Sequence, residues 1–206
     1  MNEDDEDVRR AWAERSGEFS PEYYAYRGAD ATSARLRGLL ERTVGRDAHV
    51  LEVGCSAGRH LAHLLDDGFE NLTGVEVNEE AFDVMAETYP DLAATGTFHR
   101  DAVENVLPDL SDDAVDATFS VETLQHVHPD AEWVFAELVR VTADLLVTVE
   151  NEDGVADGDV NYVDEGLPLY YRDWGAVFRD LGMVEVAVHE GDHDTTRAFR
   201  PPDRTD

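Results

Sequence analysis

The sequence contains no lysine: all 16 basic residues are arginine, against 47 aspartates and glutamates, and the net charge is −31. Carboxylates bind water and cations strongly, and concentrated salt screens their mutual repulsion. We therefore expect an acidic, halophilic protein of the cytoplasm. A surface of this charge repels phosphate backbones, so no nucleic-acid partner is expected. The missing lysine also excludes a P-loop, because that motif needs a lysine to reach a phosphate.

Cysteine and long apolar runs are scarce as well. Cys55 is the only cysteine, which excludes an internal disulfide and a cysteine-based metal cage, so we expect it to be a small packed residue. No apolar run is long enough to span a bilayer, and no membrane partner is expected. His60 and His63 lie three residues apart without further ligands nearby, so we predict a solvated helix face and no metal site.

Alternating helical and strand-like segments fill most of the 206 residues. Residues 8–46 are typical of helices, with starts at Ser20-Pro21 and at Asp30. The predicted strands that follow are 49–53, 72–77, 95–100, 114–121 and 144–150, with helices at 58–68, 79–89 and 129–141. This alternation predicts an α/β fold with a doubly wound, mostly parallel sheet and helices on both faces.

The C-terminal part breaks the alternation. Residues 151–169 are acidic and glycine-rich, and we expect a polar loop there. After a helix at 171–182, strands at 183–190 and 195–200 are joined by a short turn, so they pair as an antiparallel hairpin. We expect one compact unit, in which residues 1–46 form an N-terminal helical cap and residues 47–206 form the core.

The stretch VLEVGCSAGRH, residues 50–60, predicts a ligand site. In open α/β sheets the ligand lies beyond the carboxyl ends of the strands. Gly54 and Gly58 follow the first predicted strand and allow close backbone approach. Glu52 precedes them, and its carboxylate suits a cationic group better than a diphosphate. Glu76 ends the second strand and Asp101-Ala102 follows the third, so three strand ends offer contacts for an adenosine.

A nicotinamide dinucleotide is the rival ligand for such a turn. Its pyrophosphate would require further glycines near positions 56 and 59, so that it can approach the helix N-terminus. Ser56 and Arg59 stand there instead. The turn therefore favours a different adenosine-containing ligand.

Four elements together resemble one known family. They are Glu52-x-Gly54-x-Ser56-x-Gly58, then Glu76, then Asp101-Ala102, then FSVETLQHV at 119–127. This order is similar to that of the class I S-adenosylmethionine-dependent methyltransferases, in particular small single-domain members that act on small molecules. The resemblance implies a Rossmann-like sheet of seven strands with the last antiparallel, and S-adenosylmethionine as cofactor in the 47–206 core.

The resemblance also assigns roles to residues. It implies that Gly54, Ser56 and Gly58 line the methionine part of the cofactor, that Glu76 holds the ribose, that Asp101 and Ala102 meet the adenine, and that Ser120 lies beneath the site. Ser56 departs from the usual middle glycine of the motif. Because serine is small, we expect the turn to tolerate it.

Methyl transfer needs in-line alignment of the acceptor, exclusion of water and sometimes removal of a proton. His126 follows the fourth strand and is the candidate base, because the ordinary pKa of histidine suits proton removal. Tyr23, Tyr24, Arg27 and Tyr162 are candidates for an aromatic lid over a small acceptor. The alternative is that these tyrosines only fix the first helices to the sheet.

We therefore predict S-adenosylmethionine-dependent methyl transfer to a small-molecule acceptor by in-line displacement. One alternative is a non-catalytic cofactor-binding or scaffold protein with the same fold. A less favoured alternative is an NAD-dependent oxidoreductase. The sequence predicts neither the acceptor nor the oligomeric state.

Overall fold

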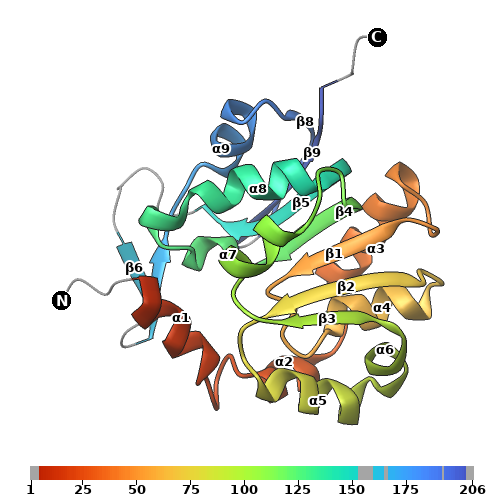
Figure 1. Cartoon of the computed structure of the whole chain (residues 1–206), viewed down its shortest axis with the longest axis vertical. Coiled ribbons are helices and arrows are strands. Elements are labelled where there is room, and N and C mark those ends of the chain that lie inside the picture. Colours follow the sequence, from red (N-terminus) through yellow and green to blue (C-terminus); the bar gives the residue numbers. More distant parts are fainter. Residues whose placement is uncertain (1–4, 153–159, 165–166, 192, 203–206) are drawn as a thin grey trace.

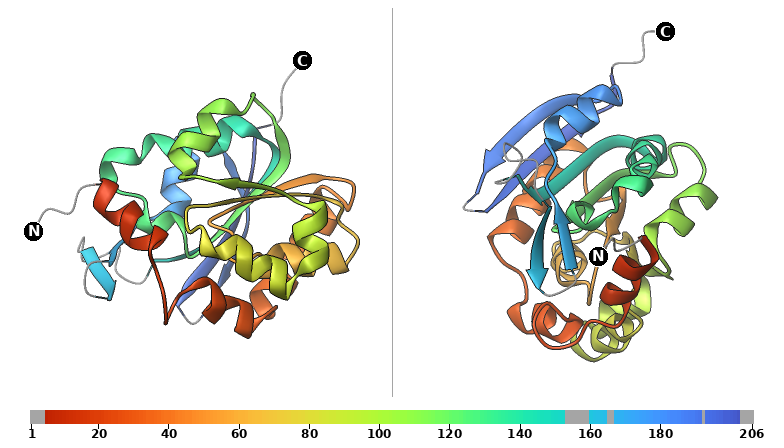
Figure 2. Two further views of the ribbon diagram at one scale, coloured as in Figure 1. Left: turned by 60° about the horizontal axis from the view of Figure 1, so that its bottom comes forward. Right: turned by 90° about the vertical axis from the view of Figure 1, so that its left-hand side faces the viewer.

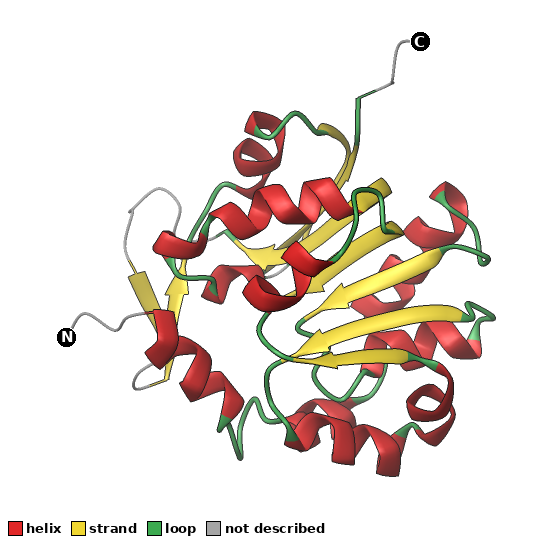
Figure 3. Cartoon of the chain, in the orientation of Figure 1, coloured by secondary structure: helices red, strands yellow, loops and turns green. Residues whose placement is uncertain are grey.

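The computed structural model describes residues 5–152, 160–164, 167–191 and 193–202. Its centre is a seven-stranded sheet of order β3-β2-β1-β4-β5-β9-β8 (Figure 1, Figure 3). The strands are β1 His49–Val53, β2 Asn71–Glu76, β3 Thr97–Arg100, β4 Val115–Val121, β5 Thr142–Asn151, β8 Val184–Glu190 and β9 Asp194–Arg200. Strands β1 to β5 are parallel, and β9 is antiparallel to both β5 and β8. This confirms the predicted doubly wound, Rossmann-like α/β fold with its antiparallel C-terminal strand.

Helices cover both faces of the sheet, as the edge-on views in Figure 2 show. One face carries α3 Ala31–Thr43, α4 Arg59–Asp66, α5 Glu80–Thr88 and α6 Pro90–Thr95, and the other carries α7 Val103–Val106, α8 Trp133–Val141 and α9 Trp174–Asp180. Neighbouring strand residues point to opposite faces. Val50 accordingly packs in the core with Leu40 and Leu61, and Leu51 packs with Leu138 and Trp174. Burial on both faces explains why these strands read as nearly continuous apolar runs.

The predicted helix starts are present in the N-terminal segment. Ser20 caps α2 Pro21–Arg27 by accepting from the Tyr23 N–H, and Asp30 caps α3 by accepting from the Ser33 N–H. The Ser33 hydroxyl accepts from the Asp30 N–H in return, which completes a capping box. A cap of this kind contributes about 1 kcal/mol. A further helix, α1 Asp5–Ala13, precedes these two.

The sequence prediction of a polar loop at residues 151–169 was wrong in part, because this segment contains strands. Strand β5 continues to Asn151, and β6 Val160–Asp164 pairs antiparallel with β7 Leu167–Tyr170 as a separate two-stranded sheet. Leu167 and Leu169 are buried. The sequence prediction missed these strands because the segment around the two leucines is acidic and glycine-rich, and the alternation of apolar residues is short. Residues 153–159 and 165–166 lie outside the described part of the chain.

Several short elements also escaped prediction. They are α6, α7, and the 3-10 turns Leu107–Asp109 and Leu124–His126, while Pro129–Ala131 forms a 3-10 turn at the start of the predicted 129–141 helix. Helix α8 passes directly into β5 at Thr142, two residues before the predicted strand start. The Thr142 hydroxyl donates to the Leu138 carbonyl at 2.7 Å and so satisfies an acceptor at the end of the helix. Among the described residues, we find no helix with the length and apolar character needed to span a membrane.

The carboxyl ends of β1 to β5 meet at one edge of the sheet, and α1 lies across that edge (Figure 1). The Asn78 amide group, just after β2, donates to the carbonyls of Trp12 at 3.3 Å and Arg15 at 3.1 Å. These bonds fix the end of α1 beside the strand ends. The arrangement encloses a cavity between α1, α2 and the sheet.

Candidate functional site

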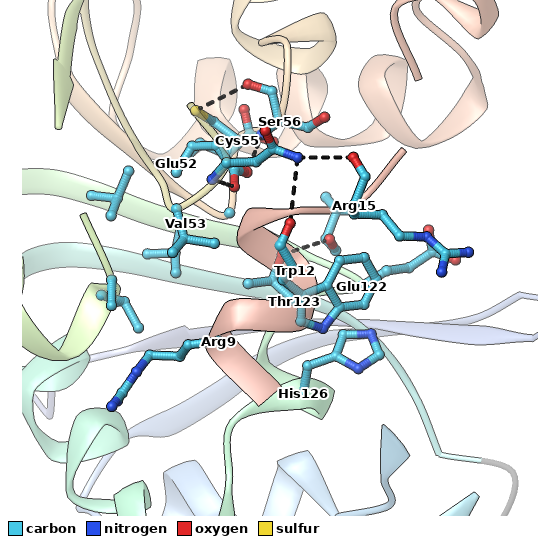
Figure 4. A pocket seen from close by; sticks show the side chains of 18 of the residues that line it. Arg9, Trp12, Arg15, Glu52, Val53, Cys55, Ser56, Glu122, Thr123 and His126 are labelled. Carbon is cyan, nitrogen blue, oxygen red and sulfur yellow. Dashed lines mark hydrogen bonds between the residues drawn. The ribbon is translucent and has the colours of Figure 1, made fainter. Parts of the chain in front are cut away.

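The cavity at the strand ends has a volume of about 1130 Å³ with its open mouth included. Its lining comes from the N-terminal helices, the turn after β1, the end of β2, the segment after β3 and the segment after β4 (Figure 4). Residues far apart in the sequence therefore share one wall. This is the position at which a doubly wound sheet binds its ligand.

The turn after β1 follows an unusual backbone path. Gly54 and Ser56 have φ values of +68° and +47°, in the left-handed region that disfavours side chains. A Cβ atom on Gly54 would lie 2.3 Å from the Thr123 Oγ1 atom, so glycine is required for the turn to meet the segment after β4. Ser56 adopts the left-handed conformation despite its side chain, at a cost of about 1 kcal/mol.

Gly58 lies outside the cavity lining and close to two helices. It lies at the start of α4 with φ +81°, and a Cβ atom there would meet Leu92 at 2.7 Å and Met85 at 3.0 Å. Gly58 therefore allows α4 to pack against α5 and α6 and does not line the cavity. The glycine spacing alone did not distinguish contact with a helix from contact with a ligand.

Glu76 lies at the carboxyl end of β2 and lines the cavity. One carboxylate oxygen accepts from the Ser56 N–H at 2.8 Å, and the other accepts from the Asn78 N–H at 2.7 Å. Burial raises the pKa of Glu76, while these backbone donors lower it. Each oxygen retains a further lone pair, so the group can hold the turn and still accept from ligand hydroxyls.

Glu52 is the most unusual group in the wall. It is 1% exposed, and its Oε2 atom is buried without a hydrogen-bond partner among the described residues. Burial raises the pKa of Glu52 well above its ordinary value, and nearby Arg59 opposes that shift. Arg59 is itself engaged by Asp30 at 2.7 Å. A buried, unpartnered carboxyl group beside a cavity favours a cationic or hydrogen-bond-donating ligand.

Asp101 and Ala102 follow β3 and line the same cavity. The Asp101 Oδ1 atom accepts from the Ala102 N–H at 2.8 Å and from the Asn105 amide at 2.7 Å. The polar edge of Asp101 therefore stands beside an apolar wall formed by Ala102 and Val103. Such a pair fits a flat ring that carries an amino group.

Ser120 is buried at the end of β4, outside the cavity lining, and its hydroxyl donates to Glu150 at 2.8 Å. Glu150 was not identified from the sequence. Its carboxylate also accepts from three successive backbone N–H groups, those of Thr123, Leu124 and Gln125. Burial raises the pKa of Glu150 to about 8, although all four hydrogen bonds lower it. Glu150 therefore holds the segment after β4 against the cavity. The sequence feature that could have identified Glu150 is its position as an acid at the end of the apolar run LLVTVE.

His126 belongs to the segment that Glu150 holds, and it lines the cavity. Its Nδ1 atom lies 2.9 Å from the Pro168 carbonyl oxygen, so Nδ1 carries the proton and Nε2 is the acceptor. Burial lowers the pKa of His126 to about 4, below the ordinary value expected from sequence. The Trp12 ring lies 4.6 Å from the imidazole, centroid to centroid, at an angle of 55° (Figure 4).

Of the four predicted lid residues, one lines the cavity and three lie outside its lining. Tyr24 lines the cavity, together with Trp12 and Phe19, which the sequence analysis did not select. Tyr23 and Arg27 lie outside the lining and bond to each other, because Arg27 donates to the Tyr23 hydroxyl at 3.0 Å. Tyr162 is 53% exposed on β6, also outside the lining. The Tyr23 ring packs edge-to-face on the Tyr24 ring at 5.3 Å, so Tyr23 supports Tyr24 from outside the cavity.

The histidines on α4 need one correction. His60 is 4% exposed, and its Nδ1 atom lies 2.8 Å from the Ser33 hydroxyl, so it does not lie on a solvated face. Burial lowers the pKa of His60 to about 3. In the described part of the chain, no group of three or more histidine, cysteine or acidic side chains is arranged to hold a metal ion. Cys55 is buried and unpaired, as expected of a packed residue.

Comparison with known proteins finds similarity to methyltransferases over part of the chain. Residues 50–144 match the family model described as a methyltransferase domain. An O-methyltransferase from Pyrenophora dematioidea is 25% identical over 119 residues, which cover 54% of this chain and 43% of that protein. The chain thus spans less than half the length of this curated relative.

Two solved structures share the fold. The 1,6-didemethyltoxoflavin-N1-methyltransferase of Burkholderia thailandensis, with bound 1,6-didemethyltoxoflavin and S-adenosylhomocysteine, has a TM-score of 0.66 and 21% identity over 84% of this chain and 79% of its own. The [4+2]-cyclase SpnF has a TM-score of 0.68 and 17% identity over 93% and 86% of the two chains. Residues 50–144 therefore carry the similarity to a methyltransferase domain, and the solved structures show the fold that the chain shares with them.

Proposed function

We propose that the cavity binds S-adenosylmethionine and that the chain transfers the methyl group to a small-molecule acceptor. One observation carries the proposal: the buried, unpartnered Glu52 carboxyl group on β1 and the Glu76 carboxylate at the end of β2 line the same cavity, beside the turn that passes through Gly54. This is a wall for a cationic, hydroxyl-bearing ligand. The diphosphate of a dinucleotide offers these two acids neither a positive charge nor a hydrogen-bond donor.

The residues present fit this cofactor along its length. Glu76 would accept from the ribose hydroxyls, and Asp101 with Ala102 would meet the amino edge and the face of the adenine. Gly54 and Ser56 would allow the methionine part to approach the backbone, with Glu52 near its positive charge. Ser120 would act beneath the site, through Glu150, without touching the cofactor.

When bound, the cofactor supplies a methyl group already activated by its sulfonium. The chain has to position the acceptor and exclude water. Trp12, Phe19 and Tyr24 provide an aromatic wall on the side of the N-terminal helices. His126 presents Nε2 as a proton acceptor, because its Nδ1 proton is held by Pro168. Its low pKa fits a weak base that takes a proton already made acidic by the transfer.

The acceptor is a small molecule in this proposal, because α1 and α2 of the predicted 1–46 cap lie over the cavity, whereas α3 packs on the sheet as part of the core. Two bonds from Asn78 support the cap by tying α1 to the end of β2. A polymer would have to displace that helix. The lysine-free, strongly acidic composition supports adaptation to a salt-rich cytoplasm, and it disfavours nucleic acid as a substrate.

The test is transfer of label from methyl-labelled S-adenosylmethionine to pools of small phenols, amines, carboxylic acids and nitrogen heterocycles, with the full chain in multimolar KCl. We expect one pool to acquire label. Glu76→Ala should abolish transfer, and Glu80→Ala, which changes an exposed acid four residues away, should not. Cofactor binding without label in any pool would leave a non-catalytic binding protein, and loss of both would reject the proposal.

A further inference from the structure

A second hollow lies away from the cofactor cavity, between α3 and the strands β8 and β9. Its volume is about 460 Å³ with its open mouth included. The lining residues are Arg35, Leu39, Arg42, Ala187, Val188, His189, Thr196 and Ala198, and none of them lines the first cavity. We propose that this hollow is a binding site for a small oxyanion, a phosphate or a carboxylate group.

The first observation is a pair of arginines without carboxylate partners. Elsewhere, arginines of this acidic chain commonly pair with acids: Arg37 and Arg46, close to the same helix, both contact Glu41 and Asp67. Within the described ranges, Arg35 and Arg42 contact no carboxylate. The chain has 47 acids and 16 arginines, so two neighbouring arginines without a carboxylate partner are unusual. We infer that their guanidinium groups bind an anion from solution.

The geometry brings these two arginines to one place. They lie seven residues apart on α3, which is two helical turns, so they share a face of the helix with Leu39 between them. Arg35 Nη2 lies 2.8 Å from His189 Nε2 on β8. A guanidinium can only donate, so His189 accepts and holds Arg35 over the hollow. The planar guanidinium fork suits an oxyanion.

The second observation is a buried hydroxyl without a partner. Thr196 on β9 is 3% exposed, and its Oγ1 atom makes no hydrogen bond with any residue that the structure describes. Leaving such a group unsatisfied costs about 1–3 kcal/mol, and the anion's oxygen is the partner that the site lacks. Leu39, Ala187 and Ala198 add apolar walls, which would accommodate the carbon part of an organic acid.

None of the described residues that line the hollow is an acid. Glu185, on the same strand as His189, is held by Arg179 at 2.9 Å and by Arg197 at 2.6 Å. The chain carries a net charge of −31 and repels anions over most of its surface. Binding of an oxyanion here would therefore depend on the residues of the hollow, because the net charge of the chain does not attract anions.

The test is titration of the full chain with inorganic phosphate and, separately, with acetate, at constant potassium concentration. Arginine side-chain NMR signals report binding. We expect saturable shifts of the Arg35 and Arg42 signals, at least fivefold weaker binding in Arg35→Gln and Arg42→Gln, and several-fold weaker binding in the near-isosteric Thr196→Val. The probe that binds more tightly identifies the class of oxyanion.

Arg200→Gln is the matched control, because Arg200 is exposed on β9 outside the hollow and the variant makes the same change in net charge. It should leave the affinity unchanged. Shifts that do not saturate with either probe would overturn the proposal. Equal weakening in Arg200→Gln would also overturn it, because the effect would then be one of overall charge.

Discussion

Replacement of Glu150 by alanine tests how the segment after β4 is held in place. The Glu150 carboxylate accepts four hydrogen bonds, from the Ser120 hydroxyl and from the N–H groups of Thr123, Leu124 and Gln125. Each buried donor left without an acceptor costs about 1–3 kcal/mol. Because the segment can shift toward water, the full sum is not reached. We expect Glu150→Ala to lower the free energy of unfolding by about 3–5 kcal/mol.

Glu150→Gln keeps the shape of the side chain and one acceptor oxygen. Its amide NH₂ group, however, is a donor and faces backbone N–H groups that are also donors. We expect a loss of about 1–2 kcal/mol for this variant. The assay is urea unfolding in concentrated KCl, followed by circular dichroism and extrapolated to zero urea. Asp144→Ala is the control, since Asp144 is exposed on the same strand and should change stability by less than about 0.5 kcal/mol. A Glu150→Ala loss of similar size to the control would refute the reasoning.

Gly54→Ala should lose at least tenfold in S-adenosylhomocysteine affinity by calorimetry, because its Cβ atom would lie 2.3 Å from Thr123 Oγ1; Gly45→Ala, with φ +83° and open space, should keep that affinity. Ser56→Gly should raise the free energy of unfolding by a few tenths to about 1 kcal/mol, because it relieves a left-handed serine at φ +47°; a lower value would contradict the strain. Burial lowers the pKa of His126 to about 4, so the unfolded chain binds the extra proton and stability is lost as pH falls from 6.5 toward 4, by about 3 kcal/mol. Urea unfolding across this pH range should show a smaller loss in His126→Asn, and an equal loss would exclude His126 as the source.

The sheet and its helix starts were predictable because local signals and burial agree there. Strand β1 is buried from Val50 to Val53 and is apolar there apart from Glu52, since both of its faces are covered. Ser20 and Asp30 cap the helices that they were expected to begin. The β6–β7 pair was missed because its acidic surroundings outweighed the two leucines, Leu167 and Leu169, that fix it in place.

The candidate site was only partly predictable, for reasons of tertiary structure. The sequence pointed to Glu52 and Glu76 because strand ends meet at one edge of a parallel sheet. It did not identify Trp12, since the path of α1 over that edge depends on contacts between segments 66 residues apart. Gly58 was predicted to contact the ligand. The spacing of glycines in a sequence does not show whether a ligand or a neighbouring helix approaches each of them. Glu150 acts on a segment 25 to 27 residues away, which no local pattern records.

The central claim is that Glu76 and its neighbours form a site for S-adenosylmethionine. The most direct measurement is calorimetric titration of the full chain in concentrated KCl with S-adenosylhomocysteine and with NADH, for wild type, Glu76→Gln and the exposed-acid control Glu80→Gln. We predict saturable binding of S-adenosylhomocysteine but not NADH, at least tenfold weaker binding in Glu76→Gln, and no change in Glu80→Gln. Binding of NADH in preference, or an unchanged affinity in Glu76→Gln, would contradict the account.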